Sequence, residues 1–230
     1  MTEHKDIYTS ATDRYQALVA REDYQGNLLP AVQSIDSLIG KDVLELGAGT
    51  GRISCLIAPF CHRLVAMDIS HHMLSLGLKR LAHLGLSNWH LSLAAHRGLP
   101  VASQSADVII SGWSFCYAAL GGGEDWRPAL KTALREAARV LRPGGKLILI
   151  ESLGTGFETP NRPDVLVNYL SYLDNDGFES TWVHTDYCFT DESEARDLTT
   201  FFFGDSPMPM WETDLGVIVP ECTGLWWKRL

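Results

Sequence analysis

The stretch Val43-Leu44-Glu45-Leu46-Gly47-Ala48-Gly49-Thr50-Gly51-Arg52 decides the fold of this chain. Three apolar residues and one carboxylate are typical of a short buried strand, and three glycines follow at alternate positions. The apolar residues from Ile53 to Ala58 predict that a helix begins directly afterwards. Glycine adopts positive φ and lets a ligand approach the backbone, and unpaired N–H groups at a helix start favour an anionic or electron-rich group. The stretch therefore predicts a ligand-binding turn between a strand and a helix.

An acidic residue follows at the end of the next apolar run. Asp68 comes directly after Leu64-Val65-Ala66-Met67, and its carboxylate is placed to accept hydrogen bonds from ribose hydroxyls. A dinucleotide fingerprint reads G-x-G-x-x-G, whereas here Gly51 comes one position early and Arg52 stands where the third glycine belongs. These residues indicate a nucleoside-type cofactor, and by themselves they leave both NAD and S-adenosylmethionine (SAM) open.

Strands and helices alternate along the chain up to Glu151. Apolar runs predict strands at 42–46, 63–68, 89–93, 106–111 and 146–150. Helices are expected between them, including one that Ser70 caps and one over 126–141 that Pro143-Gly144-Gly145 ends. This alternation predicts an α/β fold with a parallel sheet covered on both faces. Ligands bind such sheets at the carboxyl ends of the strands, where the predicted edge collects Gly47–Gly51, Asp68, the loop after Leu93, Ser111–Trp113 and Glu151.

The segments on either side of this core show other patterns. Residues 10–37 predict helical segments with a break at Gly26-Asn27. After the core, we expect a helix over 164–174, a strand over 178–189, a helix over 191–203 and one or two strands over 216–228. No linker is long enough to separate a second domain. We therefore expect one domain over 1–230, with a helical cap (1–39), a cofactor-binding core (40–151) and a substrate-side helix and hairpin (152–230).

Composition limits the partners and the compartment. The chain has 230 residues, of which 46% are apolar, and a net charge of −9. Phosphate binding needs a basic footprint, so this acidity disfavours nucleic acid or an anionic membrane as the main partner. Five scattered cysteines, a polar N-terminus and the absence of an apolar run near the roughly 18 residues of a membrane span predict a cytoplasmic protein. The histidine and cysteine spacings predict no metal site.

Four segments, in order and spacing, resemble the class I SAM-dependent methyltransferases, and most closely their small-molecule, methyltransferase type 11-like branch. They cover roughly residues 40–151 and are Val43–Gly51, Met67–Ser70 with Met73-Leu74, Gly98–Pro100 with Ser105–Ile109, and Ala137–Leu147. The resemblance implies a Rossmann-like, doubly wound, mostly parallel seven-stranded sheet with an antiparallel C-terminal hairpin. It also implies SAM as the cofactor and a small molecule as the methyl acceptor.

The resemblance further implies roles for individual residues. Glu45 is expected under the glycine loop near the methionine amine of the cofactor, and Asp68 is expected on its ribose. A tyrosine of the N-terminal segment, such as Tyr24, is expected at the methionine end. The full predicted cofactor set is Tyr24, Glu45, Gly47, Ala48, Gly49, Gly51, Arg52, Asp68, Ile69, Met73, Ala95, His96 and Ser111.

One position departs from the pattern of the family. Many members have an aspartate four residues before the pair that corresponds to Leu99-Pro100, and it accepts a hydrogen bond from the adenine amine. This chain has Ala95 there, which cannot accept, so the adjacent His96 or backbone groups are the remaining candidates. Losing one hydrogen bond costs on the order of 1 kcal/mol, which is less than tenfold in affinity. The SAM interpretation therefore stands.

The catalytic residues are less defined by the sequence than the cofactor set. His184, Tyr15 and Tyr187 are the candidates. A sulfonium methyl is already electrophilic, so alignment and desolvation supply much of the catalysis, and a base is needed only for an acceptor that arrives protonated. Two alternatives stay open: an NAD(P)-dependent oxidoreductase, and a catalytically inactive SAM-binding or partner protein of the same fold. The acceptor atom and the oligomeric state also stay open.

Overall fold

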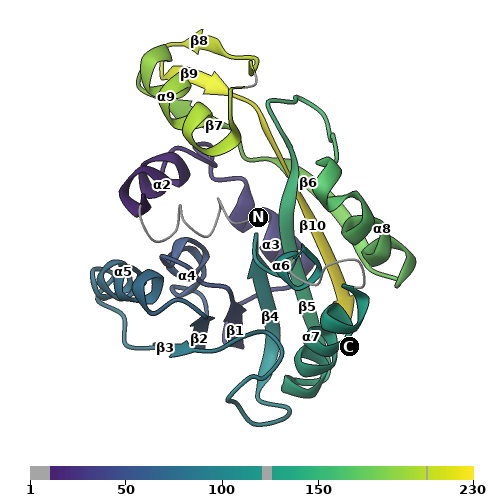
Figure 1. The fold of residues 1–230 in the computed structure, drawn as a ribbon. Helices are drawn as coiled ribbons and strands as arrows, with labels where there is room; N and C mark the ends of the chain where they lie inside the picture. The colour runs from purple at the N-terminus through teal and green to yellow at the C-terminus, as the bar shows by residue number, and fades with distance from the viewer. Residues whose placement is uncertain (1–10, 121–125, 206) are drawn as a thin grey trace. The chain divides into compact units, whose positions relative to one another are not determined.

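Figure 1 shows the computed structural model, which describes residues 11–120, 126–205 and 207–230. Within these residues the main sheet has seven strands in the order β3-β2-β1-β4-β5-β10-β6. They are β1 (Asp42–Leu46), β2 (Arg63–Asp68), β3 (Trp89–Leu93), β4 (Ala106–Gly112), β5 (Leu141–Thr155), β6 (Glu179–His184) and β10 (Glu221–Arg229). The pairs β1–β2, β1–β4, β2–β3 and β4–β5 are parallel, and the C-terminal strands form an antiparallel pair. The predicted α/β fold class is confirmed.

The chain divides into two compact units. Unit 1 holds the described residues up to Ala31 together with Ser152–Asp164 and Trp182–Gly224. Unit 2 holds Val32–Glu151, Val165–Thr181 and Leu225–Leu230. The expected division of one domain at residues 39 and 151 stays a prediction, and each unit is described by itself below.

The central strands of unit 2 are buried along almost their whole length. Val43, Val108 and Leu147 are each at most 2% exposed, and Val43 pairs with Leu64 on one side and with Val108 on the other. Burial on both faces explains why the strands are continuous apolar runs. The helices of this unit that follow or flank the strands are α4 (Arg52–Ile57), α5 (His71–Ala82), α6 (Tyr117–Leu120), α7 (Arg127–Val140) and α8 (Val167–Asn175).

Several element boundaries differ from the prediction. The helix expected over 126–141 ends at Val140, because Gln104 and Ser105 donate backbone hydrogen bonds to its last carbonyls, on Arg139 and Val140. The following strand begins at Leu141 rather than at 146, since Leu141 already pairs with Ala106 across a register irregularity. The helix expected over 164–174 begins as one 3-10 turn, η1 (Asp164–Leu166), before α8.

Unit 1 contains a small antiparallel sheet in the order β7-β9-β8, with β7 (Tyr187–Phe189), β8 (Trp211–Thr213) and β9 (Gly216–Val219). Its core joins Leu18 of α2 (Thr12–Val19), Leu198 of α9 (Glu192–Phe203) and Val219 of β9. The strand expected over 178–189 is wrong as one element. It breaks after β6, where the carbonyls of Thr185 and Asp186 accept backbone hydrogen bonds from residues 23 and 24. The break predicted at Gly26-Asn27 is confirmed, since α3 (Leu28–Ile35) begins directly after it.

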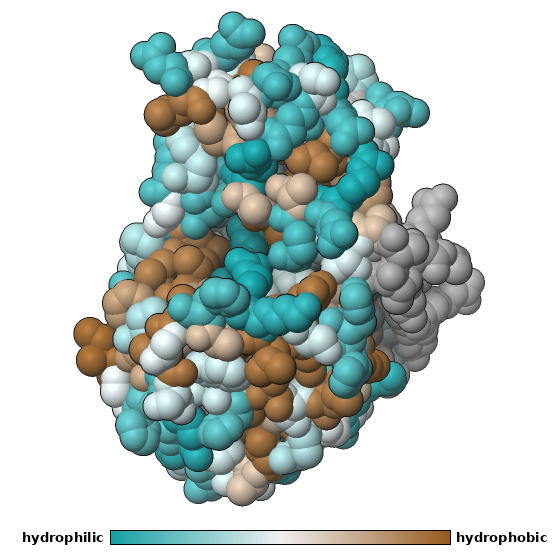
Figure 2. All heavy atoms as spheres, turned by 90° about the vertical axis from the view of Figure 1, so that its left-hand side faces the viewer, coloured by the Kyte–Doolittle hydropathy of each residue, from teal (hydrophilic) through white to brown (hydrophobic). Residues whose placement is uncertain are grey.

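The surface over α5 and β3 mixes apolar and polar residues, as Figure 2 shows. Ile69, Leu78 and Leu93 are at least half exposed there.

In the part of the chain that the structure describes, no helix combines the length and the apolar character that a membrane crossing requires. The same residues contain no cluster of three or more side chains suited to hold a metal ion.

Candidate functional site

The glycine loop of unit 2 turns sharply between β1 and α4. Gly47, Gly49 and Gly51 have φ of 77°, 54° and 80°, a region that residues with a Cβ rarely adopt. The backbone N–H groups of Gly47 and Ala48 both donate to the carbonyl of Met67, at 2.8 Å. Because Met67 lies on β2, beside the last residue of β1, these bonds fold the loop across the carboxyl end of β2.

Asp68, the last residue of β2, holds this loop with its side chain. Its Oδ2 accepts from the Gly49 N–H at 2.8 Å, and its Oδ1 accepts from the Ser70 N–H at 2.7 Å. Ser70 in turn caps α5, since its hydroxyl accepts from the Met73 N–H at 3.3 Å. A carboxylate oxygen has a second lone pair, so Asp68 can hold the loop and still accept from a ligand hydroxyl. The ribose contact itself stays a prediction.

Glu45 lies on β1 and is only 1% exposed. Its carboxyl accepts a hydrogen bond from the hydroxyl of Ser54 on α4. Burial raises the pKa of Glu45 to about 7, because the charged form loses its hydration. The carboxyl thus joins β1 to α4 beneath the loop, and the predicted contact with a ligand amine stays a prediction.

A close contact between α5 and the loop was not foreseen from the sequence. A Cβ placed on Gly77 of α5 would lie 3.3 Å from the carbonyl carbon of Thr50 and 3.4 Å from the Gly51 nitrogen. These distances are shorter than most contacts that a Cβ makes, so a side chain at position 77 would require the helix or the loop to shift. The sequence did carry a signal, since an isolated glycine inside a helical pattern usually has a packing reason.

Ser114 lies against the other side of the loop and was also missed. A Cβ placed on Gly47 would lie 1.9 Å from Ser114 Oγ, which shows how closely this side chain approaches. Ser114 Oγ is 3.3 Å from Nε2 of His96, a predicted cofactor residue. Burial lowers the pKa of His96. Arg52, another predicted residue, places its guanidinium 4.3 Å from the ring centre of Trp113.

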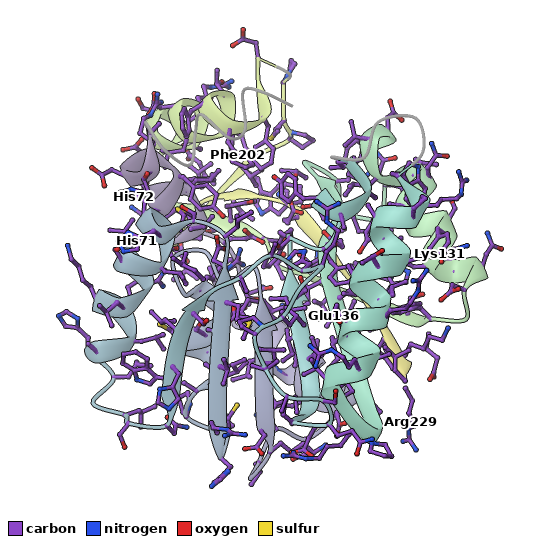
Figure 3. The ribbon with its side chains drawn as sticks, turned by 60° about the horizontal axis from the view of Figure 1, so that its bottom comes forward. His71, His72, Lys131, Glu136, Phe202 and Arg229 are labelled. Atoms are coloured by element: carbon purple, nitrogen blue, oxygen red, sulfur yellow. The ribbon has the colours of Figure 1, made fainter. Side chains whose placement is uncertain are left out.

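The other predicted residues of unit 2 differ in accessibility. Ser111 is fully buried, and its hydroxyl donates to the Leu46 carbonyl at 2.9 Å, so it joins β4 to β1. Met73 and Ala48 are buried, whereas Ile69 is 78% exposed. Ala95 is exposed and forms an isolated bridge with Gly98. Figure 3 shows His71 and His72 at the beginning of α5.

A second buried carboxyl stands at the same edge of the sheet. Glu151 on β5 is 1% exposed, and its Oε1 accepts from the Cys116 N–H at 3.1 Å and from the Tyr169 hydroxyl at 3.0 Å. Burial raises its pKa to about 7. Glu151 therefore joins β5 to the segment after β4 and to α8.

The remaining candidates belong to unit 1. His184 Nδ1 is 3.2 Å from Asp186 Oδ1, and its ring meets Trp182 edge-on. The hydroxyl of Tyr187, which is buried, donates to Glu22 at 3.2 Å. Tyr15 packs against Phe202, and the hydroxyl of Tyr24 accepts from Gln25. Their proposed roles toward cofactor or substrate stay predictions.

Comparison with known proteins identifies relatives of this chain. A family model described as a methyltransferase domain matches residues 44–149. The chain is 30% identical over 168 residues to a demethylmenaquinone methyltransferase of Clavibacter sepedonicus, covering 73% of this chain and 62% of that protein. It is 36% identical over 107 residues to a malonyl-[acyl-carrier protein] O-methyltransferase of Methylococcus capsulatus, covering 46% of this chain and 35% of the relative. The matches thus leave more than a third of each relative uncovered.

A solved structure supports the fold independently. The chain superposes on a SAM-dependent methyltransferase from Aquifex aeolicus with a TM-score of 0.56 and 15% sequence identity, covering 88% of this chain and 89% of that one. At this identity the likeness concerns the fold alone.

Proposed function

Because the chain belongs, through residues 44–149, to the class I SAM-dependent methyltransferases, we propose that it transfers a methyl group from SAM to a small-molecule acceptor. One observation carries this proposal: three glycines at positive φ form a turn at the end of β1, and Asp68 holds it. The residues fit such a ligand. Among the residues that the structure describes, only Met73 Cε lies within 4 Å of the position that a side chain on Gly49 would take, and the Asp68 carboxylate accepts from the Gly49 N–H beside it.

The residues of unit 2 have different parts in this proposal. The loop offers its backbone at Gly49, where a ligand can approach, and Asp68 orients the ribose hydroxyls while it fixes the loop. SAM supplies an electrophilic methyl group when bound. The protein then mainly aligns an acceptor and excludes water, so catalysis rests on proximity and desolvation. We assign no general base, and His184, Tyr15 and Tyr187 remain candidates.

The names of the relatives favour a small acceptor without selecting its atom. One acts on demethylmenaquinone and another on a malonyl group carried by a protein. The net charge of −9 adds to this, since nucleic acid binding needs a basic surface. We also propose a reducing compartment such as the cytoplasm, because all five cysteines are free thiols.

A methyl-transfer assay tests this function. The full chain is incubated with SAM labelled in its methyl group and with a panel that contains quinols, phenols, carboxylic acids and amines. We expect label to pass to one acceptor class, with S-adenosylhomocysteine formed in equal amount. Binding of SAM without transfer to any acceptor would favour the inactive relative. Binding of a nicotinamide cofactor instead of SAM, seen by its fluorescence, would favour the oxidoreductase.

A further inference from the structure

The segment after β4 contacts the glycine loop at Gly47, within unit 2. The Ser114 hydroxyl and its Cβ would lie 1.9 Å and 2.2 Å from a Cβ on Gly47. Within the described part of the chain, a Cβ on Gly49 would meet no such crowding, since the nearest atom there, Met73 Cε, is 3.7 Å away. Because glycine has no side chain, a ligand could approach the backbone beside Gly47. Ser114 fills that space.

The strand order explains how Ser114 and His96 come together. His96 lies in the loop after β3, and Ser114 lies after β4, while β2 and β1 stand between those strands in the sheet. The contact between Ser114 Oγ and His96 Nε2, at 3.3 Å, therefore spans the strand ends from which the glycine loop and Asp68 project. The His96 ring also stacks on Phe115, with the ring centres 5.4 Å apart and the planes at 18°.

The backbone on both sides of Ser114 is fixed. The Trp113 N–H donates to the Ile150 carbonyl at 2.7 Å, and the Cys116 N–H donates to Glu151 at 3.1 Å. Trp113 has φ of +48°, an unfavourable conformation for a bulky residue that its surroundings must maintain. The Arg52 guanidinium over its ring is one such contact. Turning the Ser114 side chain moves only its hydroxyl away from Gly47, because its Cβ, 2.2 Å from the position of a Cβ on Gly47, is attached to this backbone. Freeing Gly47 therefore also requires a short backbone shift at Ser114, within the segment that these two hydrogen bonds bound.

We propose that Ser114 and His96 form a latch that covers Gly47 and must open before the cofactor can bind the glycine loop. This inference rests on the proposed function. Latch closure and full ligand contact at Gly47 exclude each other, because Ser114 occupies the space that the ligand needs. The apparent affinity for the cofactor is then the affinity of the open form multiplied by the fraction of molecules in which the latch is open. Ser114 would thus set cofactor affinity by competing for the loop.

Two substitutions at one position separate the parts of the latch. Ser114→Gly removes both the hydroxyl and the Cβ that crowd Gly47, whereas Ser114→Ala removes only the hydrogen bond to His96. We expect Ser114→Gly to tighten binding of S-adenosylhomocysteine by about fivefold, which corresponds to one net hydrogen bond, and to speed association in stopped-flow measurements. Ser114→Ala should give a smaller change in the same direction. The control is Ser103→Gly, an exposed turn residue before β4, which should leave binding unchanged.

The outcomes distinguish the latch from the function on which it rests. If neither the wild type nor any folded variant binds SAM or S-adenosylhomocysteine, the proposed function is wrong and the latch falls with it. If the wild type binds and both Ser114 variants bind equally well or more weakly, only the latch is wrong, since Ser114 then does not compete with the ligand. Tighter and faster binding by Ser114→Gly, with Ser103→Gly unchanged, supports the latch.

Discussion

The Asp68 carboxylate shows how one side chain can organise two elements. One of its oxygens accepts a hydrogen bond from the Gly49 N–H in the glycine loop, and the other accepts from the N–H of Ser70, the residue that caps α5. Hydrogen bonds to a charged acceptor are stronger than those between neutral groups. The loop therefore keeps its shape through the same group that is predicted to meet the ligand.

Replacing Asp68 with asparagine should weaken cofactor binding by about tenfold or more, because a hydrogen bond to a charged carboxylate is worth about 1.5–3 kcal/mol, more than one between neutral groups. The amide keeps the size of the side chain, but its NH₂ cannot accept, so a backbone N–H or a ligand hydroxyl loses its partner. Titration calorimetry with S-adenosylhomocysteine measures the effect. Asp107→Asn is the matched control, because Asp107 pairs with Arg142 at the beginning of β4. Wild-type affinity in Asp68→Asn would show that this carboxylate has no part in binding.

The buried Glu151 should make stability depend on pH. Its folded-state pKa of about 7 lies above the ordinary 4.5, so the folded chain binds more protons between these values. This contribution is fully present below pH about 4.5 and is lost as the pH rises through 7, amounting to roughly 3 kcal/mol at most. Glu151→Gln should therefore make the change in unfolding free energy between pH 5.5 and 8.5 smaller without abolishing it, because the pKa of Glu45 is also raised to about 7. Urea titration measures this change.

Glu136→Gln provides the control for that experiment. The hydrogen bond from Arg139 lowers the pKa of Glu136 to about 2, so its contribution is present above pH about 4.5 and is lost only as the pH falls toward 2. This substitution should shift stability by the same amount at every pH from 5.5 to 8.5. If Glu151→Gln gave a profile parallel to the wild type, the raised pKa would be wrong.

At the scale of elements, the position of α5 depends on Gly77, which has no side chain. Gly77 lets the helix approach the loop backbone at Thr50 and Gly51 more closely than a residue with a Cβ would allow without a shift. This contact depends on the tertiary arrangement of α5 and the loop, so the helical pattern alone could not locate it. The capping of α5 by Ser70, in contrast, is a local interaction and was predicted correctly.

Gly77→Val should separate α5 from the loop. A branched side chain would collide with the loop backbone, and overpacking of this kind costs about 1–3 kcal/mol. We expect a lower thermal midpoint together with weaker binding of S-adenosylhomocysteine, measured by scanning calorimetry and titration. Leu78→Ala on the same helix is the control, because Leu78 is half exposed. Unchanged stability and affinity in Gly77→Val would mean that the helix does not support the loop.

At the scale of the whole molecule, the sequence predicted the elements that depend on local pattern. The strands at 42–46, 63–68 and 89–93 appear with the expected bounds, because buried parallel strands are continuous apolar runs. The position of Asp68 beside the glycine loop followed from strand order. Ser114 was missed, since its contact with Gly47 arises from residues far apart in the sequence. The change of direction after β6 was missed for the same reason, because residues 23 and 24 supply the hydrogen bonds there.

The cysteines offer a test that involves both units. All five are free, and Cys61, Cys116 and Cys222 are buried, with burial raising their pKa values. We expect a thiol reagent to modify these three slowly in the native protein, and all five to react once it is unfolded without a reductant. Fewer than five reactive thiols in the unfolded chain would reveal a disulfide and contradict the structure.

Calorimetric titration of the full chain with SAM measures whether the glycine loop and Asp68 hold this cofactor. We predict one binding site per chain, with affinity weakened in Asp68→Asn and kept in Asp107→Asn. The Ser114→Gly variant is titrated alongside, so that a covered loop is not mistaken for a missing site. Absence of binding by both the folded wild type and folded Ser114→Gly would contradict the account.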